Sequence, residues 1–545
     1  MAQIDFLLRL IRLAGNNQRK LFWASIVAGA LQGLLLYVMN ACIKELSAGS
    51  GISLRNFLLF VLCLVGLYKC LNLSMSVSSK VARDLITGFE VRLSEKISQT
   101  SYAHFTSLDK GAIYEAITGS KDIINESAIM LPIFISSLTM LACSLIFSLF
   151  ISVAGLVAVL IVMGLAAALF LLSDKNFMKA LMSYRDSATD FQSSLKDVIL
   201  GFTELKMNEN RRKALFAEQI EPFSQEVVTR RTVADGYRVQ NTVMYGLMVY
   251  FPVGALLFVL PQTGLITIEH CVKIVGITLF STIPLIGLLS FMPLAARGAF
   301  IVNGLETFEH TLDTMLDSPP ETGGPTEEFC SIHITDASYV YPAPENGVQP
   351  FSLKIDKFSL SKGELVILRG GNGSGKSTFM QILAGLEPFT VGTILLNGES
   401  VAHMGAARYR TYFSVLFPDF HIFAGLYGMD VEPDRVRMLL RRMALSEKVQ
   451  YDPQTRRFST TALSSGQRKR LAMACAILEG RPVILLDEVA ADFDHHFRNV
   501  FYNELLPELK AEGRTILAIS HDDRYFSVAD RVLTMRYGEF VDDGD

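Results

Sequence analysis

Residues 365–378 read LVILRGGNGSGKST, and this stretch decides the fold class of the soluble part of the chain. Its first four residues are apolar, as in a buried strand, and the rest fits GxxxxGK[ST] in the order strand, loop, helix. In such a loop backbone N–H groups wrap phosphate oxygens, the lysine neutralises phosphate charge and the hydroxyl binds Mg²⁺. We therefore expect this phosphate loop to bind a nucleotide, and Ser377 to bind the metal as well, through Gly370, Asn372, Gly373, Ser374, Gly375, Lys376, Ser377 and Thr378.

Two acids follow a second apolar run, in the segment PVILLDE at 482–488. A buried strand here delivers both acids to its carboxyl end. We expect Asp487 to hold Mg²⁺ directly or through water, and Glu488 to act as the general base that polarises the attacking water. A further apolar run, TILAIS, precedes His521, which is placed to reach a γ-phosphate.

The segment LSSGQ at 463–467, the signature loop, opens an amphipathic stretch that reads RKRLAMACAILEG. A helix that begins here directs backbone N–H groups and a positive dipole end outward, which suits an anion. In isolation the segment is an ordinary helix cap. Together with the other motifs, it predicts a second nucleotide-binding element made of Ser464, Ser465, Gly466 and Gln467.

The composition requires that part of the chain faces lipid. Of 545 residues, 50% are hydrophobic and only 19% are charged, and the mean hydropathy is +0.33. A water-soluble surface could not hide so many apolar side chains. The net charge of −4 gives no basic field, which argues against a nucleic-acid partner.

Six apolar segments are long enough to cross a bilayer of about 30 Å. They lie at 21–43, 56–78, 128–150, 153–173, 241–261 and 271–293. The second-to-third and fourth-to-fifth connections are long, and they carry six Lys/Arg between 79 and 127 and eleven between 174 and 240. The short loop 262–270 carries none. By the positive-inside rule both long connections and both termini are expected in the cytoplasm.

The domain boundaries follow from these patterns. We expect an all-α transmembrane domain at 1–316, a linker rich in Pro, Gly and acids at 317–328, and an α/β cassette with a P-loop at 329–545. Apolar periodicity persists in both long connections, so the membrane helices are expected to continue into the cytoplasm.

The order of phosphate loop, LSSGQ, LLDE and SH resembles the ATP-binding cassette family, and six spans before the cassette resemble its exporter half-transporters. This resemblance covers essentially the whole chain. It implies that two cassettes sandwich two ATP molecules, each held by the phosphate loop of one chain and the signature loop of the other. It also implies a homodimer, or a heterodimer with a similar half.

By the same resemblance Tyr341 stacks on adenine, Asp494 belongs to the D-loop at 491–494, and His521 is the switch histidine. Coupling helices are implied near 113–120 and 201–208.

One position departs from the family pattern. The segment FSVLFPDFHIF at 413–423 places Pro418 where most of the family has a metal-contacting Gln, and Asp419 is the nearest polar substitute. The stretches at 368–378, 487–510 and 518–540 resemble the subfamily that exports cyclic peptides and siderophores. In that group this position is also commonly not Gln. The resemblance implies a bacterial inner-membrane exporter of a peptide-like secondary metabolite.

Other functions stay open at this point. A lipid flippase or a multidrug exporter shares the same motifs, and a more distant alternative is a membrane regulatory protein that binds ATP without transport. A periplasmic adaptor is a further candidate partner. Lys69 lies inside the second span, where it meets an anionic substrate or else snorkels to the interface or pairs with a neighbour.

Overall fold

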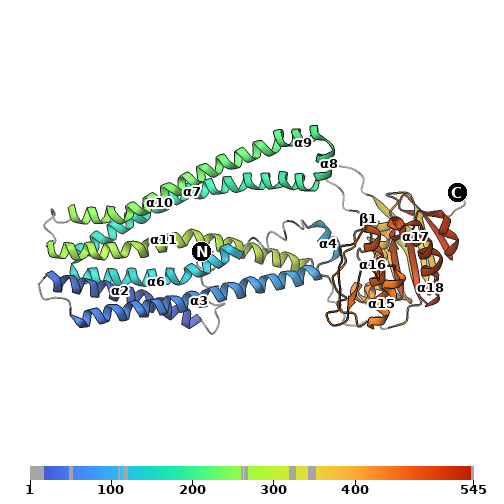
Figure 1. Cartoon of the computed structure of the whole chain (residues 1–545), viewed down its shortest axis with the longest axis horizontal. Coiled ribbons are helices and arrows are strands. Elements are labelled where there is room, and N and C mark those ends of the chain that lie inside the picture. The colour runs from blue at the N-terminus through green and yellow to red at the C-terminus, as the bar shows by residue number, and fades with distance from the viewer. Residues whose placement is uncertain are drawn as a thin grey trace. The chain divides into compact units, whose positions relative to one another are not determined.

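The computed structural model describes residues 18–47, 53–108, 111, 113, 119, 121–258, 262, 268–317, 327–341 and 351–541 (Figure 1). The chain divides into two compact units. One unit comprises Met1–Ser94 and Asp109–His310, and the other comprises Glu95–Leu108 and Thr311–Asp545. The segment Glu95–Leu108, from the first long connection, therefore groups with the cassette. Most of the expected linker at 317–328 lies outside the described residues, and the expected domain boundaries stay a prediction.

The first unit is built from long helices that run side by side (Figure 1). They are α2 (Gln18–Ser47), α3 (Leu54–Gln99), α6 (Lys121–Ile151), α7 (Val153–Leu200), α10 (Glu221–Phe258) and α11 (Ile268–Thr314). The turn between α7 and α10 is made by α8 (Phe202–Met207), α9 (Glu209–Leu215) and the π-helical segment Phe216–Ile220. Several of these helices extend well past the apolar segments seen in the sequence. At about 1.5 Å per residue, the 46 residues of α3 span roughly 70 Å, more than twice the hydrocarbon core.

Four described helical stretches are long and apolar enough to cross a membrane: Arg19–Ile43, Leu54–Gln99, Lys121–Ile151 and Val272–Thr314. They match the first, second, third and sixth expected spans. The fourth expected span falls on α7, whose apolar run Val153–Leu165 is shorter, and the fifth falls on α10 and on residues outside the described part. On α3 only 11% of the apolar window is buried, which leaves its apolar side chains to lipid or to another chain.

Small and hydroxyl residues bring these helices close together. A Cβ at Gly29 of α2 would overlap the carbonyl oxygen of Ser136 of α6, so the two backbones nearly touch. The Ser127 hydroxyl donates to Ile123 O within α6 at 2.7 Å and approaches Leu294 O of α11 at 3.3 Å. Ser78 of α3 donates to the carbonyl of Ala128. Helix contacts in this unit therefore depend on residues that let backbones approach.

The cassette contains two main sheets. The four-stranded antiparallel sheet has the order β2-β1-β4-β5. Its strands are β1 (Ser331–Val340), β2 (Ser352–Ser361), β4 (Val391–Leu396) and β5 (Glu399–Ser400). The six-stranded sheet has the order β12-β11-β3-β10-β9-β6 and is parallel except for β12. Its strands are β3 (Leu365–Gly370), β6 (Phe413–Leu416), β9 (Val483–Asp487), β10 (Thr515–Ile519), β11 (Arg531–Arg536) and β12 (Glu539–Val541). A short hairpin joins β7 (Tyr451–Asp452) and β8 (Arg457–Phe458).

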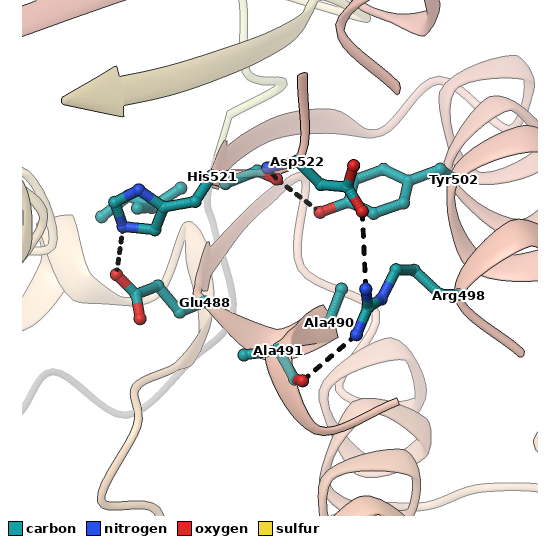
Figure 2. A pocket seen from close by; sticks show the side chains of 9 residues that line it. Glu488, Ala490, Ala491, Arg498, Tyr502, His521 and Asp522 are labelled. Atoms are coloured by element: carbon teal, nitrogen blue, oxygen red, sulfur yellow. Dashed lines mark hydrogen bonds and ion pairs between the residues drawn. The ribbon is translucent and has the colours of Figure 1, made fainter. Parts of the chain in front are cut away.

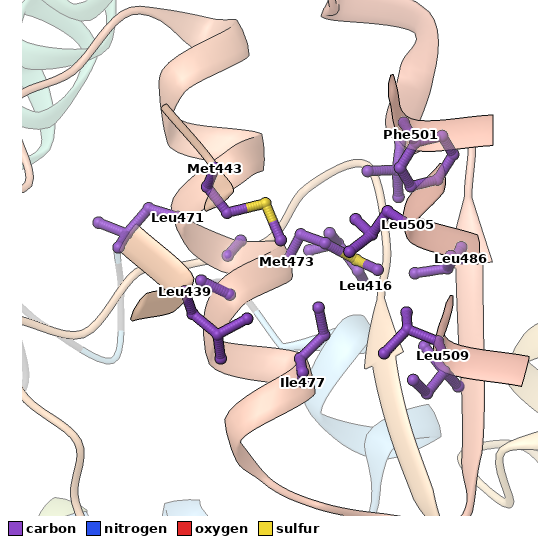
Figure 3. Packing of buried hydrophobic residues seen from close by; sticks show 14 of the residues in the cluster. Leu416, Leu439, Met443, Leu471, Met473, Ile477, Leu486, Phe501, Leu505 and Leu509 are labelled. Atoms are coloured by element: carbon purple, nitrogen blue, oxygen red, sulfur yellow. The ribbon is translucent and has the colours of Figure 1, made fainter. Parts of the chain in front are cut away.

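Helices and apolar side chains fix this sheet in place. The cassette helices are α12 (Lys376–Leu383), α13 (Val401–Met404), α14 (Ala406–Arg410), α15 (Pro433–Arg442), α16 (Ser465–Leu478), α17 (His495–Val500) and α18 (Leu506–Ala511). The short helix α4 (Tyr102–Ser107) also belongs to this unit. Figure 3 shows one core cluster, in which Met443, Met473 and Ile477 pack towards Leu416 and Leu486 of the sheet. Every residue of β9 and β10 is buried.

The strand register brings the expected catalytic positions to one edge. Ile519 at the end of β10 pairs with Leu368 of β3 on one side and with Asp487 of β9 on the other. Because carboxyl ends of parallel strands meet at one edge, the residues that follow these three strands converge. The phosphate loop, the acid pair and His521 all leave the sheet here.

Candidate functional site

The phosphate loop has the geometry that its sequence predicts. Strand β3 ends at Gly370, and α12 begins at Lys376. Gly375 has φ +100°, and a Cβ there would lie 2.9 Å from the Phe351 ring, so only glycine fits. The Lys376 amine donates to the carbonyls of Gly370 and Gly371, each at 2.9 Å, which holds it over the loop. Burial lowers the pKa of Lys376, and the nearby Glu488 and Asp487 oppose that shift.

Asp487 is buried at the end of β9 with a side chain suited to a metal ion. It is 1% exposed, and among the described residues neither carboxylate oxygen has a hydrogen-bond partner. Burial raises the pKa of Asp487, while the neighbouring Ser377 hydroxyl lowers it. A buried unpaired carboxylate beside a hydroxyl fits Mg²⁺, which takes oxygen ligands and completes its shell with phosphate oxygens and water. When bound, the ion would neutralise charge on the phosphates.

Glu488 and His521 meet although 33 residues separate them. His521 Nε2 lies 2.9 Å from Glu488 Oε1, as Figure 2 shows. Both side chains are partly exposed, at 46% and 38%, so water and a phosphate can reach them. Glu488 has φ 50° and ψ 34°, a left-handed backbone that is uncommon for residues other than glycine. The structure thus joins the expected general base and the expected switch histidine.

The residues of the signature loop contact one another and the D-loop. The Ser464 hydroxyl accepts from Gln467 N, and Gln467 Oε1 accepts from Ser464 N at 3.2 Å, which makes a capping box at the start of α16. A Cβ at Gly466 would lie 2.6 Å from Asp492 O. Asp494 caps α17 by accepting from Phe497 N at 2.8 Å, and this bond lowers the pKa of Asp494. Ser465 is the first residue of α16.

The expected adenine-stacking residue lies beside the phosphate loop. The Tyr341 hydroxyl is 3.0 Å from Thr378 Oγ1, near the start of α12. Its ring meets Tyr339 edge-on, with ring centroids 5.1 Å apart. One part of the ring stays exposed, at 39% for the residue. Asn372 and Ser377 are exposed as well.

Comparison with known proteins identifies the family. A family model described as ABC transporter matches residues 353–491. "ATP-binding protein SyrD" of Pseudomonas syringae pv. syringae is 30% identical over 470 residues, which cover 84% of this chain and 83% of SyrD. The chain belongs to the ABC transporter family. "Macrolide export ATP-binding/permease protein MacB" of Escherichia coli (strain K12) is 31% identical over 228 residues, 38% of this chain and 34% of MacB. MacB of Shewanella oneidensis is 31% identical over 229 residues, again 38% of this chain and 34% of MacB.

Membership confirms the main predictions from the sequence. This protein is an ATPase coupled to transport, and its cassette binds ATP with Mg²⁺. The similarity to SyrD also covers the helical half, which is the transmembrane domain of an exporter of this family, with the cassette in the cytoplasm. A chain with one cassette is a half-transporter, and half-transporters work as dimers.

Two contacts near the site were not expected from the sequence. Tyr102 of α4 accepts a hydrogen bond from Gln381 Nε2 of α12 at 3.3 Å. Burial raises the pKa of Tyr102, and the charge of Asp419 adds to that shift, which places Asp419, the polar residue beside Pro418, close to α4. The coupling segment expected at 113–120 lies mostly outside the described residues, and the one at 201–208 contains α8. No sequence signal marked Tyr102, because a tyrosine in a helix is ordinarily a packing residue.

Sequence reasoning also did not single out two positively charged residues near the site. Lys469 of α16 and Arg498 of α17 hold the segment that joins Glu488 to Asp494. A signal for Lys469 was present in the sequence. It lies three, four and seven residues before Ala472, Met473 and Ala476, which places a lysine on the apolar face of its helix.

Proposed function

We propose that this protein is a homodimeric exporter that moves a peptide-like secondary metabolite, a siderophore precursor or a cyclic peptide, out of the bacterial cytoplasm across the inner membrane. The observation that carries this proposal is the extent of the similarity to SyrD. It covers 470 residues and so includes the membrane half, where a cargo binds, whereas the MacB similarity is confined to 228 residues. The subfamily motifs at 487–510 and 518–540 support the choice of cargo.

The roles proposed for the site combine the family resemblance with the geometry that supports them. ATP phosphates are held by the backbone of the phosphate loop and by Lys376, whose amine already lies over that loop. Ser377 and Asp487 bind Mg²⁺, and Glu488 takes a proton from the attacking water. His521, 2.9 Å from Glu488, orients that carboxylate and donates to the γ-phosphate. Tyr341 stacks on adenine.

The second half of each ATP site comes from the other copy. Ser464, Ser465, Gly466, Gln467 and Asp494 then face the nucleotide held by the partner's phosphate loop. ATP binding closes the two cassettes, the long helices transmit this closure, and hydrolysis resets it. Transport follows only if the cargo binds the inward-open and outward-open states with different affinity.

The membrane orientation is part of the proposal. The cationic long connections support a cytoplasmic position for them and for both termini. Lys69 is exposed on α3, where it is available to an anionic cargo or to the interface. A periplasmic adaptor remains a further candidate partner.

The test is ATP turnover by the purified protein in lipid, beside Glu488→Gln, with a panel of cyclic peptides, siderophore precursors, lipids and cationic drugs. We expect turnover to fall by about a hundredfold or more in Glu488→Gln, as for loss of a general base. One class of peptide should stimulate the wild type. Stimulation by lipids or drugs alone would favour a flippase or a multidrug pump, and equal activity of wild type and variant would refute the role of Glu488.

A further inference from the structure

The segment 488–494, which joins the proposed general base to the D-loop, is held by two buried or half-buried cations. On one side Arg498 donates to the carbonyls of Ala491 and Phe493, at 3.3 and 3.1 Å, and pairs with Asp522 at 3.5 Å. Figure 2 shows this arginine between Ala491 and Asp522. On the other side stands Lys469, whose side chain is only 11% exposed.

Lys469 bonds to both ends of the turn that follows β9. Its amine donates to Glu488 O at 3.2 Å and pairs with Asp492 Oδ2 at 2.9 Å. The first bond falls on the residue with a left-handed backbone, φ 50°. A non-glycine residue keeps such a conformation only when its surroundings hold it there. This amine therefore holds the backbone turn from which the Glu488 side chain leaves, whereas His521 contacts the carboxylate itself.

Lys469 also belongs to the helix that the signature loop starts. Gly466 lies one turn before it, and its Cα is so close to Asp492 O that a Cβ would lie 2.6 Å from that oxygen. The signature loop and the D-loop of one chain are thus in direct contact, through the backbone at Gly466 and through the charge pair of Lys469 and Asp492. A shift of α16 would carry Glu488 with it.

We propose that Lys469 is a positioning residue for Glu488: it fixes the backbone turn that aims the carboxylate and ties that aim to the position of the signature helix. In the dimer the signature loop faces the partner's nucleotide, so Lys469 makes one chain's general base respond to the ATP held by the other. The inference depends on ATPase activity and not on the identity of the cargo.

The chain offers a variant that separates this role from folding. Lys469→Met keeps a flexible side chain of similar length in this mostly buried position and removes only the charge and its donors. Asp492 is 43% exposed, so water can solvate its carboxylate after the change. The matched control is Lys510→Met, which also breaks a lysine–aspartate pair, with Asp530, on α18.

The experiment measures kcat and KM for ATP, binding of a fluorescent ATP analogue, and the thermal midpoint of the full-length protein in lipid. We expect Lys469→Met to lower kcat by about ten- to a hundredfold, as for a misplaced catalytic group, with KM and analogue affinity within about twofold of wild type. When Lys469→Met is added to Glu488→Gln, kcat should fall by less than about a further twofold, because Lys469 acts through Glu488. Lys510→Met should match wild type.

Asp492→Asn provides a second variant, which weakens the anchor of Lys469 while its bond to Glu488 O remains. Its kcat should fall several-fold with unchanged analogue binding. The proposal is overturned if kcat of Lys469→Met stays within about twofold of wild type, or if its loss is as large without the Glu488 carboxylate. It is equally overturned if Lys469→Met and Asp492→Asn lose ATP binding in proportion to turnover.

Discussion

Asp487 combines burial with negative charge in a way that affects stability as well as catalysis. Its carboxylate lies at the end of β9, 1% exposed, and burial raises its pKa. The folded protein therefore binds a proton at this group more tightly than the unfolded chain does. The stability that this tighter proton binding contributes is complete below the ordinary pKa of aspartate. It is lost as the pH rises through the raised pKa of Asp487. Near neutral pH the nucleotide-free fold is therefore less stable than it is below the ordinary pKa of aspartate, as far as this group is concerned.

Asp487→Asn is accordingly expected to stabilise the protein without nucleotide at pH 7. The thermal midpoint should rise by a few degrees, since about 1 kcal/mol corresponds to roughly 2–4 °C for a domain of this size. The gain should shrink as the pH falls through the raised pKa of Asp487 and should be lost below the ordinary pKa of aspartate. Mg²⁺ and ATP should no longer raise the thermal midpoint of Asp487→Asn, because the variant lacks the carboxylate proposed to bind the metal. Asp356→Asn, at an exposed aspartate, is the control. A lower midpoint for Asp487→Asn at pH 7 would contradict the assigned burial cost.

At the scale of single residues, the sequence predicts which side chains take part in the chemistry better than it predicts which of them are in contact. The phosphate loop, the acid pair and His521 were recognisable because each follows an apolar strand with a fixed pattern. The contact between His521 and Glu488 depends on β10 lying beside β9 in the sheet, which no local pattern states. Lys469 was missed because its partners, Glu488 O and Asp492, are a backbone atom and a side chain in a distant turn.

At the scale of elements, α2 and α6 show how membrane helices can pack without a hydrophobic driving force. Gly29 and Gly33 of α2 lie on one face, one turn apart, and meet Ser136 and Cys143 of α6. Small residues allow the two backbones to approach, so that dispersion contacts stabilise the pair.

Gly29→Ala is expected to force these helices apart, because the new Cβ would overlap the carbonyl of Ser136. Overpacking of this kind costs about 1–3 kcal/mol. The thermal midpoint of unfolding in detergent should fall. It is measured from the reactivity of the cysteines as the protein unfolds. Gly164→Ala on α7 is the control, since a Cβ there meets no described atom within 4 Å. Equal midpoints for the two variants would show that α2 and α6 are not in close contact.

Element boundaries were harder to predict than element types. The expected span at 56–78 is part of one helix that continues to Gln99, because the residues after it keep a helical pattern without Pro, and the helix continues through Gly88. The apolar residues predict a fifth span at 241–261, whereas α10 begins at Glu221 and ends at Phe258. Hydropathy locates the lipid-facing part of a helix and not its ends.

At the scale of the whole molecule, one chain carries one cassette and one set of membrane helices. Its phosphate loop and its signature loop cannot serve the same nucleotide if the family's sandwich holds, so the functional unit contains two chains. Two-fold symmetry would then place each Lys469 beside one ATP site and behind the general base of the other. Hydrolysis at the two sites would be linked through these lysines.

The proposed export is tested most directly by ATP-dependent uptake of a labelled cyclic peptide or siderophore precursor into inside-out vesicles that contain the protein. We expect uptake with Mg²⁺ and ATP, none above background with Glu488→Gln, and competition by unlabelled peptide of the same class. Uptake that is equal in wild-type and Glu488→Gln vesicles, or its absence across every peptide class while lipid or drug movement depends on ATP, would contradict the proposed export of a peptide-like metabolite.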